Sequence, residues 1–187
     1  MRKIVLTFGL IAGAILSAML VGTMPFAEQI GFDRGAVIGY TTMVLAFLLI
    51  FFGVRSYRDT VGGGTVRFGR AFAVGGLIAV VASTCYVATW EVIYFNAAPE
   101  YMTKYQAHIL EKARQSGETE AQLAARKAEM DRFAVMYQNP IINAGITFLE
   151  PLPVALVVAL VSAGVLSRRK ADLSDTGAPL GDVRQST

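Results

Sequence analysis

The sequence predicts an all-α integral membrane protein, a four-helix bundle with a helical hairpin inserted between the third and fourth spans. Three observations lead to this prediction. The 187 residues are 54% hydrophobic and only 17% charged, and the apolar residues occur in blocks. Four blocks are long enough to cross the hydrocarbon core, which takes about 20 residues of helix. A polar segment separates the third block from the fourth. We therefore expect a single membrane domain over residues 1–170.

The first predicted span covers residues 4–24 and follows two basic residues, Arg2 and Lys3. A secretory signal peptide is the competing interpretation. Its apolar region would be about 7–15 residues long and would end at a small-residue cleavage site. The apolar block here is longer, and Phe26-Ala27-Glu28 is a poor cleavage site. We therefore expect this segment to be retained as a membrane span.

Small residues recur every four positions in the first and third spans. This spacing puts them on one face of a helix, where they allow another helix to approach closely. We therefore expect these positions to face neighbouring helices: Gly9, Gly13 and Ser17 in the first span, and Gly75 and Ala79 in the third.

The second and third spans, residues 36–54 and 71–95, flank a connection that carries four arginines and one acidic residue. The three glycines at 62–64 do not predict a phosphate loop, because no Gly-Lys-Ser/Thr follows them. We interpret them as a flexible turn. The end of the third span carries an aromatic stripe, typical of a helix that leaves the membrane: Tyr86, Trp90 and Tyr94.

Residues 99–139 are polar, with six acidic and six basic side chains, and predict a helical hairpin outside the bilayer. Gly117 is a good helix stop because glycine readily adopts the left-handed conformation found there. Thr119 and Gln122 have the spacing of a capping box, which begins a helix. We therefore expect two helices with a break near Gly117.

The fourth span, residues 141–166, contains one ionisable residue, Glu150. Glu150 lies about nine residues, or roughly 13 Å, into the span and therefore close to the bilayer midplane. Two prolines follow it, and each leaves the carbonyl four residues earlier without an N–H partner. An intramembrane carboxyl group is a candidate functional site. The candidate intramembrane polar site comprises Glu150, Pro151, Pro153, Thr147 and, from the third span, Glu91.

We expect Glu150 to be protonated at neutral pH. No lysine or arginine lies at its depth in any predicted span, and removal from water disfavours the charged form of a carboxyl group. A neutral acid can donate one hydrogen bond. The expected acceptors are Glu91 or a carbonyl group freed by one of the prolines.

The distribution of basic residues predicts the orientation. Residues 1–3, 55–70 and 168–170 together carry nine basic residues and one acidic residue. By the positive-inside rule, both termini and the arginine-rich connection lie in the cytoplasm, and the hairpin lies outside it. Residues 171–187 are expected to form a disordered cytoplasmic tail. The basic side chains that we expect to contact anionic lipid are Arg55, Arg58, Arg67, Arg70, Arg168, Arg169 and Lys170.

Other kinds of site find little support in the sequence. Cys85 is the one cysteine and cannot form an internal disulfide. His108 is the one histidine, so a multi-histidine metal site is excluded. We expect no metal and no cofactor. We also expect no nucleic-acid partner, because the basic residues serve the membrane topology.

Several segments resemble one protein family. The resemblance covers roughly residues 1–170 and rests on these segments: FFGVRSYRD at 51–59, Gly63-Gly64, FGRAF at 68–72, Gly75, YQNP at 137–140 and TFLEPLP at 147–153. The chain resembles the bacterial four-span membrane proteins catalogued as domain of unknown function 4199. The resemblance implies a bacterial inner-membrane protein with a charged helical insert before its last span. It implies no activity.

Three functions are compatible with the sequence. The first is a non-catalytic structural, accessory or interaction protein, whose partners are the lipid bilayer and either copies of itself or another membrane or envelope protein. The second is a small oligomeric transporter or proton-coupled permease that uses Glu150, since polar groups at broken helices line transport sites. The third, a membrane enzyme, has only Glu91, Glu150 and His108 as candidate catalytic groups, and we do not predict an enzyme.

Overall fold

The computed structural model describes residues 1–167, and every regular element in this part of the chain is helical. The predicted class of fold is confirmed, because four helical stretches are long and apolar enough to cross a membrane. They are Arg2–Ile30, Phe32–Thr60, Phe68–Ala97 and Pro140–Leu166. The predicted tail at 171–187 lies outside the described residues, as do Arg168, Arg169 and Lys170.

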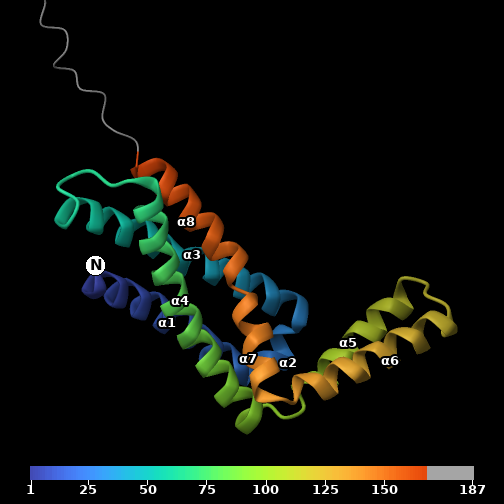
Figure 1. The fold of residues 1–187 in the computed structure, drawn as a ribbon. Coiled ribbons are helices and arrows are strands. Elements are labelled where there is room, and N and C mark those ends of the chain that lie inside the picture. The colour runs from blue at the N-terminus through green and yellow to red at the C-terminus, as the bar shows by residue number, and fades with distance from the viewer. Residues whose placement is uncertain (168–187) are drawn as a thin grey trace, which may run out of the picture.

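Shorter elements make up some of these stretches, and Figure 1 shows their arrangement. In chain order the elements are α1 (Arg2–Thr23), the 3-10 turn η1 (Met24–Phe26), α2 (Ala27–Ile30), α3 (Phe32–Thr60), α4 (Phe68–Val92), the π-helical turn η2 (Ile93–Ala97), α5 (Tyr101–Gln115), α6 (Glu120–Tyr137), α7 (Pro140–Leu149) and α8 (Leu152–Leu166).

Helix α3 continues about one and a half turns beyond the apolar block that predicts it. Its last residues are charged or polar, but none of them breaks a helix, and Arg55 pairs with Asp59 one turn later. Glycines then reverse the chain toward α4, since Gly63 and Gly64 have φ values of +60° and +87°. These are left-handed conformations that glycine adopts without steric cost. The predicted flexible turn is therefore the sharp connection between α3 and α4.

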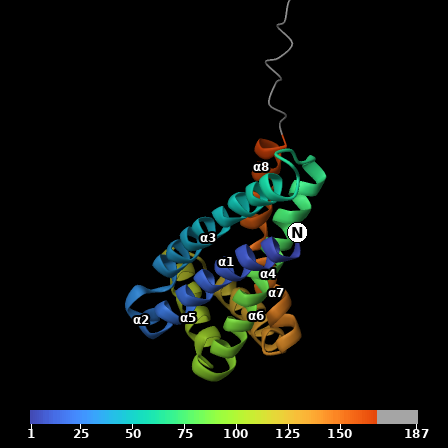
Figure 2. The ribbon, with the colours of Figure 1, turned by 90° about the vertical axis from the view of Figure 1, so that its left-hand side faces the viewer.

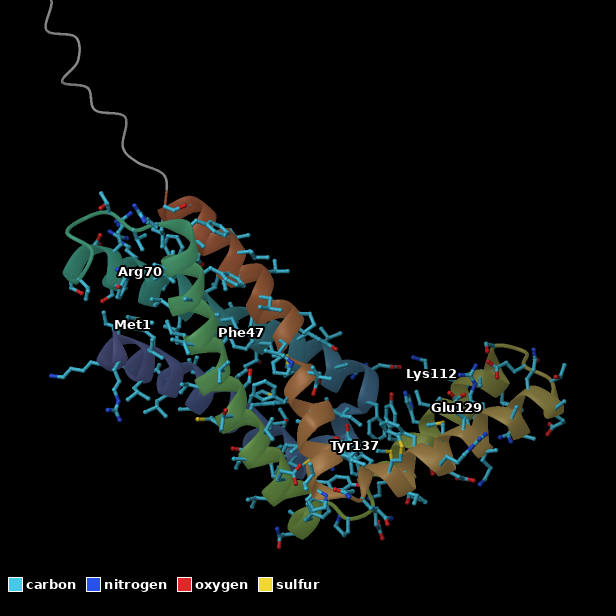
Figure 3. The ribbon with its side chains drawn as sticks, in the orientation of Figure 1. Met1, Phe47, Arg70, Lys112, Glu129 and Tyr137 are labelled. Atoms are coloured by element: carbon cyan, nitrogen blue, oxygen red, sulfur yellow. The ribbon has the colours of Figure 1, made fainter. Side chains whose placement is uncertain are left out.

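Helix α4 is the central element of the bundle. It packs against α1, α3, α7 and α8, and Figure 2 shows α1 lying across it. The core between these helices contains several large side chains that water or lipid does not reach, among them Leu16, Phe47, Ile50 and Ile78. Phe47 lies in the middle of the bundle in Figure 3.

The predicted small-residue stripe of α1 faces α4. A Cβ atom added to Gly13 would lie 2.6 Å from the Cβ of Cys85, and one added to Gly9 would lie 2.7 Å from the Cβ of Val81. Ser17, one turn further on, accepts a hydrogen bond of 2.8 Å from the Thr89 hydroxyl. The two backbones therefore approach closely along three successive turns.

The small residues of α4 face α3 and α8. A Cβ atom added to Gly75 would lie 3.0 Å from Ile50 of α3 and 3.1 Å from Ala159 of α8. Ala79, one turn later, is fully enclosed in the same core. Glycine and alanine therefore allow α4 to contact α3 and α8 at the same level.

Helices α5 and α6 form the predicted hairpin, which extends to the side of the bundle (Figure 1). The break lies where the sequence predicts it, with Gly117 at φ +86°. Thr119 and Gln122 form a complete capping box at the start of α6. Arg126 reaches back to Glu118 and lowers the pKa of that carboxyl group through their hydrogen bonds. These contacts close the tip of the hairpin.

Candidate functional site

The fourth span is broken at the candidate polar site. Helix α7 ends at Leu149 and α8 begins at Leu152, with Glu150 and Pro151 in the turn between them. Pro151 is fully buried and Pro153 lies in the first turn of α8. The first turn of a helix is where a missing N–H costs little. The prolines therefore begin a new helix rather than interrupting a continuous one.

Glu150 has a hydrogen-bond partner that sequence reasoning did not identify. The hydroxyl of Tyr86 on α4 donates to Oε2 of Glu150 over 3.0 Å. Tyr86 is buried, whereas Glu150 lies at the surface of the bundle. The sequence suggests Glu91 as a possible partner. Among the described residues, however, Oε1 of Glu91 is buried without any hydrogen-bond partner.

Thr147 belongs to a second, separate set of polar contacts near the break. Nε1 of Trp90 donates to the hydroxyl of Tyr137 over 3.0 Å. That hydroxyl lies 3.1 Å from the hydroxyl of Thr147, which in turn donates to Oδ1 of Asn143 over 3.2 Å. Nδ2 of Asn143 donates to the backbone carbonyl of Tyr137, also over 3.2 Å. We call these four residues the buried latch.

The direction of each hydrogen bond in the buried latch follows from the groups at its two ends, an indole that can only donate and a backbone carbonyl that can only accept. Trp90 can only donate, so Tyr137 accepts from it and donates to Thr147. Thr147 then donates to the amide oxygen of Asn143, and the amide nitrogen closes the ring at a backbone carbonyl. The latch joins α4, the end of α6 and α7. Because each polar group has a partner, the latch can remain in an apolar setting.

An aromatic cluster surrounds the buried latch at the end of the bundle that carries the hairpin, which we call the hairpin end. Trp90 packs edge-on against Tyr101 with ring centroids 4.9 Å apart, and Tyr94 packs against Tyr137 at 5.2 Å. Burial raises the pKa of Tyr101 to about 12, and burial also raises the pKa of Tyr137. Both hydroxyls therefore stay protonated at neutral pH.

The hairpin has a second attachment at α2 and the start of α3. Phe32 packs against Tyr101, Tyr105 and His108, with ring centroids 5.2–5.6 Å apart. On either side of these rings, Lys104 pairs with Glu28 at 2.6 Å and Lys112 pairs with Asp33 at 2.8 Å. The hydrogen bond with Glu28 raises the pKa of Lys104. Helix α5 is therefore fixed against the ends of two spans.

The four arginines around the connection between α3 and α4 lie at the opposite end of the bundle. Arg55 and Arg58 both lie beside Asp59, at 3.7 and 2.7 Å. Arg67 and Arg70 are exposed at the start of α4, and Figure 3 shows Arg70 at the far end from Tyr137. A basic surface at one end and a helical hairpin at the other give the bundle two chemically different ends.

Within residues 1–167, no three side chains among His, Cys, Asp and Glu come together as metal ligands would. The chemistry available at the broken span is hydrogen bonding by one carboxyl group, three hydroxyls, an indole and an amide. Such groups can hold helices in register or exchange protons.

The fold and this site define an all-helical, multi-pass membrane protein whose last span is broken. In the described part of the chain, its only large polar insert is the helical hairpin. The chain belongs to the family described as Protein of unknown function (DUF4199), whose profile matches residues 7–168. No curated protein and no solved structure matches the chain. The family expected from the sequence is thus confirmed.

Sequence reasoning missed most of the buried latch. Tyr86 and Trp90 fit an interfacial aromatic stripe. Their roles as donors, to Glu150 of the fourth span and to Tyr137 of α6, depend on tertiary packing. The sequence does contain a signal for a buried polar contact at Asn143, because Asn143 is the one side-chain amide in the apolar block 141–166. It also lies four residues before Thr147, and this spacing puts both side chains on one helical face.

Proposed function

We propose that this protein is a non-catalytic interaction or accessory protein of a bacterial inner membrane. It presents the α5–α6 hairpin to a partner on the extracytoplasmic side, and the partner is another membrane or envelope protein or a second copy of this chain. The observation that carries the proposal is the buried latch. Its polar groups satisfy one another and tie the end of the hairpin to α4 and α7, so they are arranged for holding a structure.

The surface of the hairpin supports this function. Its base is fixed by the buried latch and by the contacts around Phe32, while the distal part of α6 exposes charged residues of both signs. Lys127 and Asp131 pair there at 2.7 Å with both side chains at least half exposed, and Glu129 lies on the same segment (Figure 3). A rigid helix pair with mixed surface charge offers specificity for a complementary partner.

The function is tested by a photo-crosslinking amino acid placed at Glu129 in living cells. We expect a discrete adduct, and mass spectrometry of the adduct identifies the contacted protein and peptide. The matched control is the same amino acid at Val37, an exposed position on α3, which should react with lipid. Absence of a protein adduct at Glu129 and at neighbouring α6 positions would contradict the proposal.

The proposed orientation makes a prediction for reporter fusions. Fusions after Glu28 and Gly117 should report a location outside the cytoplasm. Fusions after Gly63 and Lys170 should report a location inside it. The physical reason is the positive-inside rule applied to nine basic residues against one acidic residue in the inner segments. Alkaline phosphatase and green fluorescent protein fusions measure both states. An extracytoplasmic signal at Gly63 would overturn the orientation.

A small oligomeric transporter or proton-coupled permease is the second candidate. The specific observation in its favour is that Glu150 lies at the bundle surface beside a broken helix, hydrogen-bonded only to Tyr86 among described residues. A carboxyl group in such a place can bind and release protons if water or a neighbouring copy reaches it.

Replacement of Glu150 by glutamine separates the two candidates. An amide oxygen still accepts the hydrogen bond from Tyr86, so we expect Glu150→Gln to change the melting temperature by no more than about 2 °C. An interaction protein should also keep its crosslink from Glu129. A proton carrier would instead lose all pH-driven flux in proteoliposomes, because an amide cannot titrate. Infrared spectra of the carboxyl stretch across pH, with the variant as a blank, would report whether Glu150 is protonated.

A further inference from the structure

A cavity of about 470 Å³ lies at the hairpin end, between the end of the first span and the start of α5. Its apolar wall includes Met24 and Pro25, which follow α1, and the ring of Tyr101. Its polar wall consists of Glu28, Glu100 and Lys104. Its volume falls within the range of small-molecule sites in proteins, about 300–1,000 Å³.

The three charges of this cavity follow one another in an alternating order. Nζ of Lys104 lies 2.6 Å from Oε1 of Glu28 and 3.6 Å from Oε2 of Glu100. The ammonium group has three donors and uses one of them in its hydrogen bond to Glu28, so donors remain free beside the ion pair with Glu100. Each carboxylate uses one oxygen toward Lys104 and keeps its other oxygen for another donor. The wall therefore offers one site for an anion between two sites for a hydrogen-bonding cation.

The level of the cavity relative to the spans indicates the source of such a ligand. Its walls include residues just after the end of α1 and residues at the end of η2. The cavity therefore lies where the first and third spans leave the hydrocarbon core. Phospholipid headgroups occupy this level. Val21 and Phe26, just before and after Met24 and Pro25, are 58% and 55% exposed and offer apolar surface to acyl chains.

We propose that this cavity binds the headgroup of a zwitterionic phospholipid with a primary amine, of the phosphatidylethanolamine class. The phosphate lies against Lys104, and the ammonium group donates to the free oxygen of Glu28, the carboxylate nearer to Lys104. The three side chains together carry a net charge of −1, which disfavours an anionic headgroup such as phosphatidylglycerol. Phosphatidylcholine carries the same charges as phosphatidylethanolamine, but its quaternary ammonium has no N–H to donate.

This inference is independent of the proposed function and of the orientation, because either leaflet can supply the lipid. Native mass spectrometry of the purified full-length protein in mild detergent provides the test. Phosphatidylethanolamine, phosphatidylcholine and phosphatidylglycerol with identical acyl chains are added at equal concentration. We expect the phosphatidylethanolamine adduct to exceed each of the others about tenfold, as the loss of one or two charged hydrogen bonds implies.

Lys104→Ala should lower the phosphatidylethanolamine and phosphatidylcholine adducts together, each at least threefold, because it removes the ammonium group that contacts the phosphate of both lipids. The matched control is Lys127→Ala, which removes another exposed lysine with a carboxylate partner four residues away. It should leave the adducts of all three lipids unchanged. Glu28→Gln is the second test and keeps the size of the side chain. It should lower the ratio of phosphatidylethanolamine to phosphatidylcholine at least threefold.

Three outcomes would overturn the proposal. They are equal adducts of the three lipids on the natural protein, a preference for phosphatidylglycerol, and adducts of Lys104→Ala and Glu28→Gln that both match those of the natural protein. Thermal unfolding of each variant in the same detergent confirms that the protein compared is folded. If Lys104→Ala does not yield folded protein, the result with Glu28→Gln decides alone.

Discussion

Gly13→Leu is expected to destabilise the bundle strongly. A Cβ atom at this position would lie 2.6 Å from Cβ and 2.9 Å from Sγ of Cys85. The rest of a leucine side chain would have to enter the contact between α1 and α4. Overpacking of this kind costs about 3 kcal/mol or more when backbones must separate. For a chain of this length, that corresponds to a fall in melting temperature of roughly 6–12 °C.

Gly22→Leu is the matched control, because Gly22 lies on the same helix and no atom lies within 4 Å of its added Cβ. It should change the melting temperature by no more than about 2 °C. Thermal unfolding of both variants in the same detergent, followed by circular dichroism, measures the difference. Equal melting temperatures for the two variants would show that α1 and α4 do not depend on close contact.

The parts of this fold that could be predicted are those that depend on local sequence. Four apolar blocks predict four spans because a bilayer accepts only helices with internally satisfied backbones. The break at Gly117 and the cap at Thr119 depend on residues close in the chain, and the structure has both features. The stripe at Gly9 and Gly13 predicts a close contact, but the sequence does not say that the partner is α4.

The candidate site was harder to predict because its contacts join residues far apart in the sequence. Glu150 and Tyr86 are 64 positions apart, and Trp90 and Tyr137 are 47 apart. Neither pairing follows from periodicity, since periodicity assigns a face to a residue and not a partner. The prolines did indicate the break in the fourth span. Whether they kinked one helix or began another depended on how Pro151 packs, and it is fully buried.

The buried latch and the contacts around Phe32 hold the hairpin by different physical means. The ion pairs beside Phe32 join exposed side chains, and surface pairs of this kind contribute little and are screened by salt. The buried latch lies among apolar and aromatic side chains, where an unpaired polar group is costly. The position of the hairpin should therefore depend far more on the latch than on ionic strength.

Asn143→Leu is expected to release the hairpin from the bundle. Asn143 is completely buried, and its amide serves both the carbonyl of Tyr137 and the hydroxyl of Thr147. Leucine is similar in size but cannot donate, so the carbonyl at the end of α6 loses its side-chain donor. A buried polar group left unpaired costs about 1–3 kcal/mol. We therefore expect the melting temperature to fall by roughly 4–12 °C, for a loss of about 2–3 kcal/mol.

Hydrogen exchange distinguishes this local effect from general destabilisation. In Asn143→Leu, amides of α5, α6 and the start of α7 should exchange faster, whereas those in the middle of α1 and α4 should keep their protection, because Gly13 and Cys85 still hold those helices together. Asn96→Leu is the control, since Asn96 is exposed and bonds only to the carbonyl of Val92 one turn earlier. Unchanged exchange in the hairpin of Asn143→Leu would mean that the aromatic cluster and the contacts around Phe32 suffice to hold it.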